Sequence, residues 1–249
     1  MDRKPDFLIV GAMKSGTSTL AHCLRQHSQI CMPKKELHFF DARGRFEHRW
    51  TYGREWYEAQ FPLGSPEATY GEKTPTYSYV PGAAGRIYRM YPEVKLIWIF
   101  REPVDRAYSN YWHYVCHAGK EMRSFEDAVL SDLQGYEDDI WKQYVRRSRY
   151  YEQVERYLKY FDKSSMLFLR FGELKRDFPD VFQRVCRFLN VNVGDNERWE
   201  TKPGAKNETH IPRSLRVRRL VCKIFGRESF MDRVDKKFNR RSKAGYPPM

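Results

Sequence analysis

A short segment close to the start of the sequence contains the residue types that bind phosphate groups. Residues 11–18 read Gly-Ala-Met-Lys-Ser-Gly-Thr-Ser and directly follow the apolar run Phe7–Val10. At the start of a helix the dipole favours negative charge, and Lys14 adds a full positive charge there. The backbone N–H groups and hydroxyls that could hold the anion belong to Ser15, Gly16, Thr17 and Ser18. Taken alone, the same residues could simply cap a helix.

The order of residues in this segment differs from that of a nucleoside-triphosphate-binding P-loop. That pattern needs Gly-Lys followed by Ser or Thr, whereas Lys14 here precedes Gly16. A triphosphatase of that kind also needs an acidic residue after a buried strand to hold magnesium. The apolar run Val94–Phe100 ends on Arg101 instead. An arginine at this place suits a second phosphate group that is bound without a metal ion.

A carboxylate and an imidazole lie two residues apart, at Glu36 and His38. In an extended stretch both side chains would project to the same side of the chain, and Asp41 follows closely. The three residues form a candidate acid–base cluster, in which the histidine has an ordinary pKa near neutrality. A salt bridge from Lys34 or Lys35 to Glu36 is the alternative interpretation.

Apolar runs that alternate with helical patterns predict how these residues are positioned. Strands are predicted over Phe7–Val10, Val94–Phe100 and Met166–Arg170. The predicted helices are Thr17–Gln26, Pro103–His117, Tyr150–Tyr160 and Pro179–Leu189. This alternation indicates an α/β fold with a central, mainly parallel sheet covered by helices on both faces, in a single domain over residues 1–249. We expect surface loops and short helices around the site over Asp41–Pro66 and Tyr70–Gly85.

The composition limits the partners and the compartment. Lys and Arg number 45 against 32 Asp and Glu, so the formal charge of +13 favours anionic partners such as phosphates, sulfates, acidic glycans or nucleic acid. The five cysteines are an odd number at irregular spacing, which indicates reduced thiols. No segment approaches the about 18 consecutive apolar residues of a membrane span, and the first residues lack a signal-peptide core. We therefore expect a soluble cytoplasmic protein without a membrane span.

A metal site is not expected. His113, Cys116 and His117 lie on adjacent helical turns and could in principle bind zinc. No second pair of ligands accompanies them in the sequence, so we predict that the chemistry needs no metal ion.

Several motifs, in this order along the chain, resemble the sulfotransferase family that uses 3′-phosphoadenosine 5′-phosphosulfate (PAPS). Within that family the sequence is most similar to the branch of heparan sulfate sulfotransferases. The motifs are Phe7–Gly11 with Lys14–Ser18, Lys35–Asp41, Gly71–Pro75, Arg101–Tyr111 and Phe168–Leu174. The resemblance implies a P-loop-like α/β nucleotide-binding fold and transfer of a sulfuryl group from PAPS to a hydroxyl, with adenosine 3′,5′-bisphosphate (PAP) as product.

The resemblance also implies roles for individual residues. The donor nucleotide would be held by Lys14, Ser15, Gly16, Thr17, Ser18, Arg101, Ser109 and Lys243. Among these, Arg101 and Ser109 would hold the 3′-phosphate, and only Lys243 carries over from an imperfect match to the family's C-terminal loop. The catalytic residues would be Glu36, Lys14, His38 and Lys73. Glu36 would remove the proton of the acceptor hydroxyl, with His38 as the reserve candidate, and the lysines would meet the charge that develops on the leaving oxygen.

The acceptor is the least specified part of this prediction. A hydroxyl of a carbohydrate or glycoconjugate is the first hypothesis, and a small alcohol or phenol is the second. A third reading, from another class, is a basic binding protein for nucleic acid or acidic glycan that has the fold without the catalysis. With an active enzyme, we expect no nucleic acid as partner.

Overall fold

A computed structural model describes residues 3–42, 44–65, 67–118 and 121–193. These residues form two compact units. The first contains the described residues up to Glu102 and again from Arg149, and the second runs from Pro103 to Ser148. Lys243 and the basic C-terminal stretch lie outside the described residues. The single domain over residues 1–249 stays a prediction.

The first unit is built on a sheet of five parallel strands. They are β1 (Phe7–Gly11), β2 (Ile30–Cys31), β3 (Thr69–Lys73), β4 (Lys95–Phe100) and β5 (Met166–Arg170). Their order across the sheet is β2-β3-β1-β4-β5, which places β1 between β3 and β4. The predicted fold class, α/β with a central parallel sheet, is confirmed.

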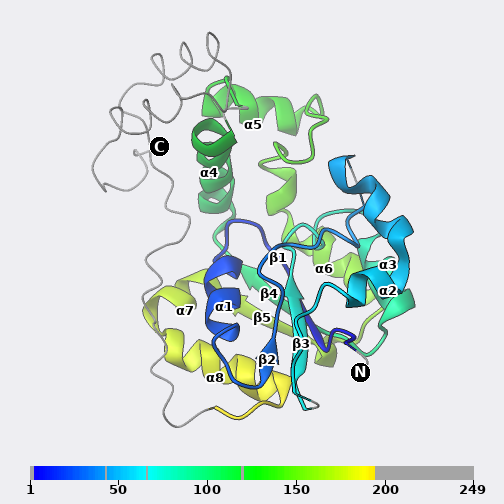
Figure 1. The fold of residues 1–249 in the computed structure, drawn as a ribbon. Coiled ribbons are helices and arrows are strands. Elements are labelled where there is room, and N and C mark those ends of the chain that lie inside the picture. Colours follow the sequence, from blue (N-terminus) through cyan, green and yellow to red (C-terminus); the bar gives the residue numbers. More distant parts are fainter. Residues whose placement is uncertain (1–2, 43, 66, 119–120, 194–249) are drawn as a thin grey trace, which may run out of the picture. The chain divides into compact units, whose positions relative to one another are not determined.

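Helices cover both faces of this sheet (Figure 1). The α-helices of the first unit are α1 (Thr17–Leu24), α2 (Gly53–Glu58), α3 (Ala83–Met90), α6 (Tyr150–Leu158), α7 (Phe171–Arg176) and α8 (Phe178–Leu189). Short 3₁₀ helices lie at η1 (Gly44–Tyr52) and η4 (Lys163–Ser165). Figure 1 shows α1, α7 and α8 on one face of the sheet and α3 and α6 on the other. None of the helices in the described part of the chain is long and apolar enough to cross a membrane.

Side chains alternate between the two faces of the strands, as the two-residue period of a strand requires. Ile9 and Ile97 are fully buried in a core that includes apolar residues of α1 and α8. Trp98, one residue further along β4, meets Tyr157 of α6 edge-on, with ring centroids 4.9 Å apart. Because both faces are buried, β1 and β4 are almost continuously apolar, which is why the sequence predicted them.

The prediction of loops and short helices over Tyr70–Gly85 is wrong for β3. This strand reads Thr-Tyr-Gly-Glu-Lys, so it lacks the apolar run that indicates a buried strand. It is nevertheless an internal strand with a buried middle, and Gly71 is needed there because a Cβ atom would come within 2.2 Å of the Phe7 ring. Over Asp41–Pro66 the expected short helices are confirmed as η1 and α2.

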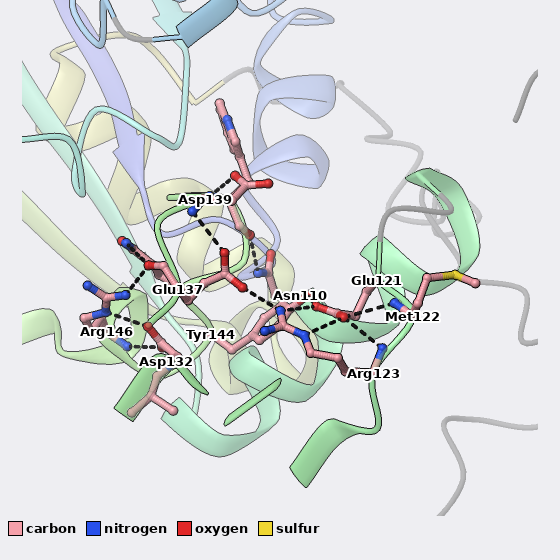
Figure 2. A network of polar contacts seen from close by, with 12 residues as sticks. Asn110, Glu121, Met122, Arg123, Asp132, Glu137, Asp139, Tyr144 and Arg146 are labelled. Carbon is pink, nitrogen blue, oxygen red and sulfur yellow. Dashed lines mark hydrogen bonds and ion pairs between the residues drawn. The ribbon is translucent and has the colours of Figure 1, made fainter. Parts of the chain in front are cut away.

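The second unit contains α4 (Pro103–His113), the π-helical turn η2 (Tyr114–Ala118), α5 (Phe125–Leu133) and η3 (Arg146–Ser148). The helix predicted up to His117 therefore ends as an α-helix at His113. Figure 2 shows a network of polar contacts within this unit. Arg123 donates to Glu121 and Glu137, at 2.9 and 2.5 Å. Asp132 accepts the backbone N–H groups of Val145 and Arg146 and the guanidinium of the latter. Each buried acid thus has donors that compensate for its burial.

Candidate active site

The loop after β1 leads directly into α1 and leaves donor groups available. Lys14 and Gly16 both have left-handed backbone conformations, with φ of 68° and 88°. The N–H groups of Thr19 and Leu20 bond to the carbonyl of Gly16, and no side chain caps the helix. The N–H groups of Thr17 and Ser18, which precede these two, therefore have no carbonyl partner within the helix.

Ser15 gives a direct test of whether this loop suits an anionic ligand. Its side chain is fully buried, yet its hydroxyl oxygen has no hydrogen-bond partner among the described residues. An unpaired buried hydroxyl is unfavourable unless a ligand completes its hydrogen bonds. The buried hydroxyl, the available N–H groups and the adjacent Lys14 together fit the phosphate and sulfate oxygens of a nucleotide donor.

The end of β4 meets the same loop. A guanidinium nitrogen of Arg101 lies 3.5 Å from the carbonyl oxygen of Lys14. The guanidinium also lies over the ring of Phe171, 5.1 Å from its centroid, and the ammonium of Lys175 lies 4.8 Å from the same ring. A Cβ atom on Gly16 would come within 2.9 Å of this ring. Phe171 therefore packs against the loop and gathers two cations beside it.

Lys73, the last residue of β3, joins the loop to the candidate base. Its ammonium forms an ion pair with Glu36 and lies 3.3 Å from the hydroxyl oxygen of Ser18. A predicted catalytic carboxylate and a predicted donor-binding residue thus share one lysine. This arrangement suits a reaction in which a group passes from an anion held by the loop to an oxygen beside Glu36.

His38 completes a continuous chain of polar contacts. Its Nε2 atom lies 3.3 Å from Glu36, and its Nδ1 atom lies 2.7 Å from Asp41. Asp41 also accepts a hydrogen bond from the hydroxyl of Thr76 at 2.5 Å. The backbone of His38 is left-handed, with φ of 50°, so the segment is not extended at this residue. The expected cluster of Glu36, His38 and Asp41 forms, although a bend rather than an extended segment brings the side chains together.

These contacts shift the pKa values of the two candidate bases, Glu36 and His38, in opposite directions. Burial alone would raise the pKa of Glu36, but the hydrogen bond from His38 and the charge of Lys73 outweigh it and lower the pKa to about 2. Burial would lower the pKa of His38, but hydrogen bonds to Asp41 and Glu36 raise it to about 9. At neutral pH the glutamate is therefore ionised and the histidine is protonated.

Comparison with known proteins identifies the family to which this site belongs. Residues 4–202 match the family described as the sulfotransferase domain. The chain belongs to the sulfotransferase family. Human and mouse heparan sulfate glucosamine 3-O-sulfotransferase 5 are 32% identical to it over 192 residues, which are 75% of this chain and 54% of each relative. Human heparan sulfate glucosamine 3-O-sulfotransferase 6 is 33% identical over 189 residues, 76% of this chain and 53% of the relative. The chain spans about half the length of these curated relatives.

Solved structures agree with this assignment. A sulfotransferase from Alicyclobacillus acidocaldarius is 32% identical and superposes with a TM-score of 0.70, over 82% of this chain and 88% of that one. The mouse sulfotransferase SULT7A1, solved with PAP, has a TM-score of 0.56 over 96% of this chain and 90% of that one. At 17% identity the second likeness shows the fold alone.

Most of the site residues that the sequence predicts lie in the first unit. The exceptions are Ser109 and Lys243. Ser109 is buried on α4 in the second unit, so its pairing with Arg101 stays a prediction. Lys243 lies outside the described residues. Within the described residues, no group of three or more His, Cys, Asp or Glu side chains is placed to hold a metal ion.

The sequence reasoning missed two polar residues next to the site, Thr76 and Glu72. Thr76 lies in the turn that follows β3, and no local pattern in the sequence marks it as a hydrogen-bond partner of Asp41. Glu72 was read only as part of a motif. Its complete burial depends on partners from other segments, which no local pattern shows.

Proposed function

We propose that the chain transfers a sulfuryl group from PAPS to a hydroxyl of a carbohydrate or glycoconjugate and releases PAP. The observation that carries this proposal is the position of Lys73, which contacts both Ser18 of the donor loop and Glu36. Family membership supports the reaction class, and relatives named heparan sulfate glucosamine 3-O-sulfotransferases support a glycan acceptor. The net charge of +13 suits an acidic glycan.

The donor-binding residues are proposed to divide between two anionic groups. The loop residues Lys14, Ser15, Gly16, Thr17 and Ser18 bind the 5′-phosphosulfate through N–H groups, hydroxyls and the lysine charge. Arg101, together with Ser109 and Lys243, binds the 3′-phosphate, and the planar guanidinium suits two phosphate oxygens at once. When bound, PAPS supplies the activated sulfuryl group.

Glu36 is proposed as the general base. It is ionised at neutral pH and can accept the proton of the acceptor hydroxyl as the oxygen–sulfur bond forms and the bond to the leaving phosphate oxygen breaks. His38 is already protonated at neutral pH, because Asp41 and Glu36 stabilise its charge, so it is poorly suited to remove a proton. Its proposed role is to orient Glu36.

Two lysines are proposed to meet the negative charge that develops during transfer. Lys14 lies in the loop that holds the phosphosulfate and would face the leaving oxygen. Lys73 contacts both Ser18 of the donor loop and Glu36, so its ammonium could meet negative charge on a sulfuryl group held by the loop. The carboxylate would then lose part of its charge compensation and become a stronger base.

The test combines turnover with donor binding. The protein is incubated with PAPS and a panel of acceptors comprising heparan sulfate oligosaccharides, simple sugars, phenols and alkyl alcohols, and release of PAP is followed. We expect turnover on the glycans. We expect Glu36→Gln to lower turnover by about 100-fold or more while PAP affinity, measured by calorimetry, stays nearly unchanged. If the protein prefers a phenol or an alkyl alcohol, the acceptor is a small molecule and not a glycan.

Two outcomes would contradict the proposal. Full activity of Glu36→Gln would mean that Glu36 is not the general base and would assign that role to His38. Absence of turnover on every acceptor, together with salt-sensitive binding of nucleic acid, would favour a binding protein that has the fold without the catalysis.

A further inference from the structure

A second carboxylate close to the site is that of Glu72, which directly precedes Lys73 in β3. Its side chain is fully buried. The hydroxyls of Tyr57 and Thr74 each donate to one of its two oxygens, both at 3.1 Å. The hydroxyl of Tyr77 also interacts with this carboxylate and favours its ionised form. All three partners are themselves fully or almost fully buried.

Two of these three hydroxyls also hold the segment that carries the candidate base. The hydroxyl oxygen of Tyr77 accepts the backbone N–H of Phe39 at 3.0 Å. The hydroxyl oxygen of Thr74 accepts the backbone N–H of His38 at 3.5 Å. Thr74 therefore donates to Glu72 and accepts from the segment. Tyr77 accepts from the segment and stabilises the ionised form of Glu72. The hydroxyl of Tyr57 donates to Glu72 and makes no hydrogen bond to the described residues of the segment, although the Tyr57 ring stacks on that of Phe39. Removing this hydroxyl therefore leaves the hydrogen bonds of the segment in place.

The segment needs such support because of its conformation. His38 has a left-handed φ of 50°, which costs a residue other than glycine about 1 kcal/mol or more. This bend directs the imidazole towards both Glu36 and Asp41. A shift in the backbone at His38 and Phe39 would therefore change the distance between His38 and Glu36.

A buried carboxyl group is an expensive way to fill space in a core. Burial raises the pKa of Glu72 to about 7 even though hydrogen bonds from Tyr77, Thr74 and Tyr57 lower it, and the negative charge of Asp41 adds to the rise. Apolar side chains of similar volume often stabilise a core at least as well as a buried charged group does. The hydrogen-bonded link to the segment gives this carboxyl a use that packing alone does not.

We propose that Glu72 is a positioning residue for sulfuryl transfer, which acts through Tyr77 and Thr74 on the backbone of His38 and Phe39. It fixes the place of the imidazole and, through it, of the Glu36 carboxylate. It touches neither donor nor acceptor. The inference rests on the proposed function for its effect on catalysis, whereas the link itself is a property of the folded chain.

The test compares two substitutions that each remove one hydroxyl from Glu72. Tyr77→Phe breaks the link to Phe39, and Tyr57→Phe is the matched control that leaves this link intact. We expect kcat to fall by about 10- to 100-fold in Tyr77→Phe, with PAP affinity unchanged, because small misplacements of catalytic groups have effects of this order. We expect Tyr57→Phe to retain kcat within about 2-fold of the unsubstituted protein, since the segment keeps both of its links.

A second measurement does not depend on activity. Amide hydrogen exchange of the peptide that contains His38 and Phe39 should be faster in Tyr77→Phe and unchanged in Tyr57→Phe. If the unsubstituted protein transfers no sulfuryl group, the proposed function fails, and the exchange comparison still tests the link. If Tyr77→Phe does not fold, Thr74→Val replaces it, with Thr74→Ser as the variant that should restore kcat.

The positioning role is overturned by either of two results. One is an equal loss of kcat in Tyr77→Phe and Tyr57→Phe, which would show a general effect on the core. The other is unchanged exchange at His38 and Phe39 after the Tyr77 or Thr74 hydroxyl has been removed.

Discussion

Replacing Lys73 by methionine should raise the pKa of Glu36. Methionine keeps much of the length of the lysine side chain but removes the charge that pairs with the carboxylate. Burial would then act against the ionised form with only the His38 hydrogen bond and charge to oppose it. Because an adjacent opposite charge lowers a carboxyl pKa by about 1 to 3 units, its removal should raise the pKa of Glu36 by a similar amount.

The ion pair between Lys73 and Glu36 also predicts the direction and the magnitude of the effect of pH on stability. The pKa of Glu36 is lowered from 4.5 to about 2, so its contribution is complete above pH 4.5 and is lost as the pH falls towards 2. At about 1.4 kcal/mol per pKa unit, the difference corresponds to about 3 kcal/mol. The Glu36 side chain is 33% exposed, so screening by solvent reduces its contribution to the free energy of unfolding to about 1 to 2 kcal/mol.

The assay is a titration of carboxyl groups by NMR on protein with ¹³C-labelled glutamate. Glu36→Gln assigns the resonance, and Lys175→Met is the matched control, because Lys175 contacts the Phe171 ring rather than Glu36. We expect the Glu36 signal to titrate near pH 2 in the unsubstituted protein and in the control, and higher in Lys73→Met. Titration near 4.5 in the unsubstituted protein, or an equal shift in both lysine variants, would refute the reasoning.

Three further predictions concern the donor loop and the histidine. Arg101→Ala should weaken PAP binding about tenfold or more, because it removes charge-assisted hydrogen bonds, and unchanged affinity by calorimetry would remove Arg101 from the donor site. Gly16→Ala should lower both the melting temperature and PAP affinity, since its Cβ would meet the Phe171 ring. Gly53→Ala controls for backbone strain, because Gly53 has a similar φ of 79° and open space around it. Equal losses of melting temperature in the two variants would contradict the role of the contact with Phe171. The pKa of His38 is raised from 6.5 to about 9, so its stabilising contribution is complete below pH 6.5 and is lost as the pH rises through 9. Urea unfolding of the unsubstituted protein and of His38→Gln should therefore differ more at pH 6 than at pH 9.5, and an equal difference at both would be contrary to this assignment.

The sequence was sufficient for strands with a largely unbroken apolar pattern, including β5, in which Leu167 and Phe168 are only partly buried. β1, β4 and β5 are short apolar runs, and the structure confirms them. β3 was missed because Gly71 and Glu72 break its apolar pattern. The glycine makes room for Phe7, and the glutamate is accommodated by hydroxyls such as that of Tyr57, which is distant in the sequence. Patterns within one window do not contain such information.

For the site, spacing predicted neighbours but not the geometry that joins them. Glu36 and His38 do meet, through a left-handed bend that their two-residue spacing does not imply. The ion pair between Lys73 and Glu36 depends on how the segment packs against the end of β3, which requires the sheet order. The roles of all the individual site residues and the cytoplasmic location remain predictions.

The position of β1 in the centre of the sheet also bears on when the donor site forms during synthesis. The loop after β1 is made early, but the residues that contact it come much later: Lys73 lies 55 positions beyond Ser18, and Arg101 lies 87 positions beyond Lys14. Contacts between such distant residues form slowly, because long loops must close first. On the ribosome, the loop therefore cannot make its contacts with Lys73 and Arg101 until β3 and β4 have been synthesised, and the contact of Arg101 with Phe171 at the start of α7 forms later still.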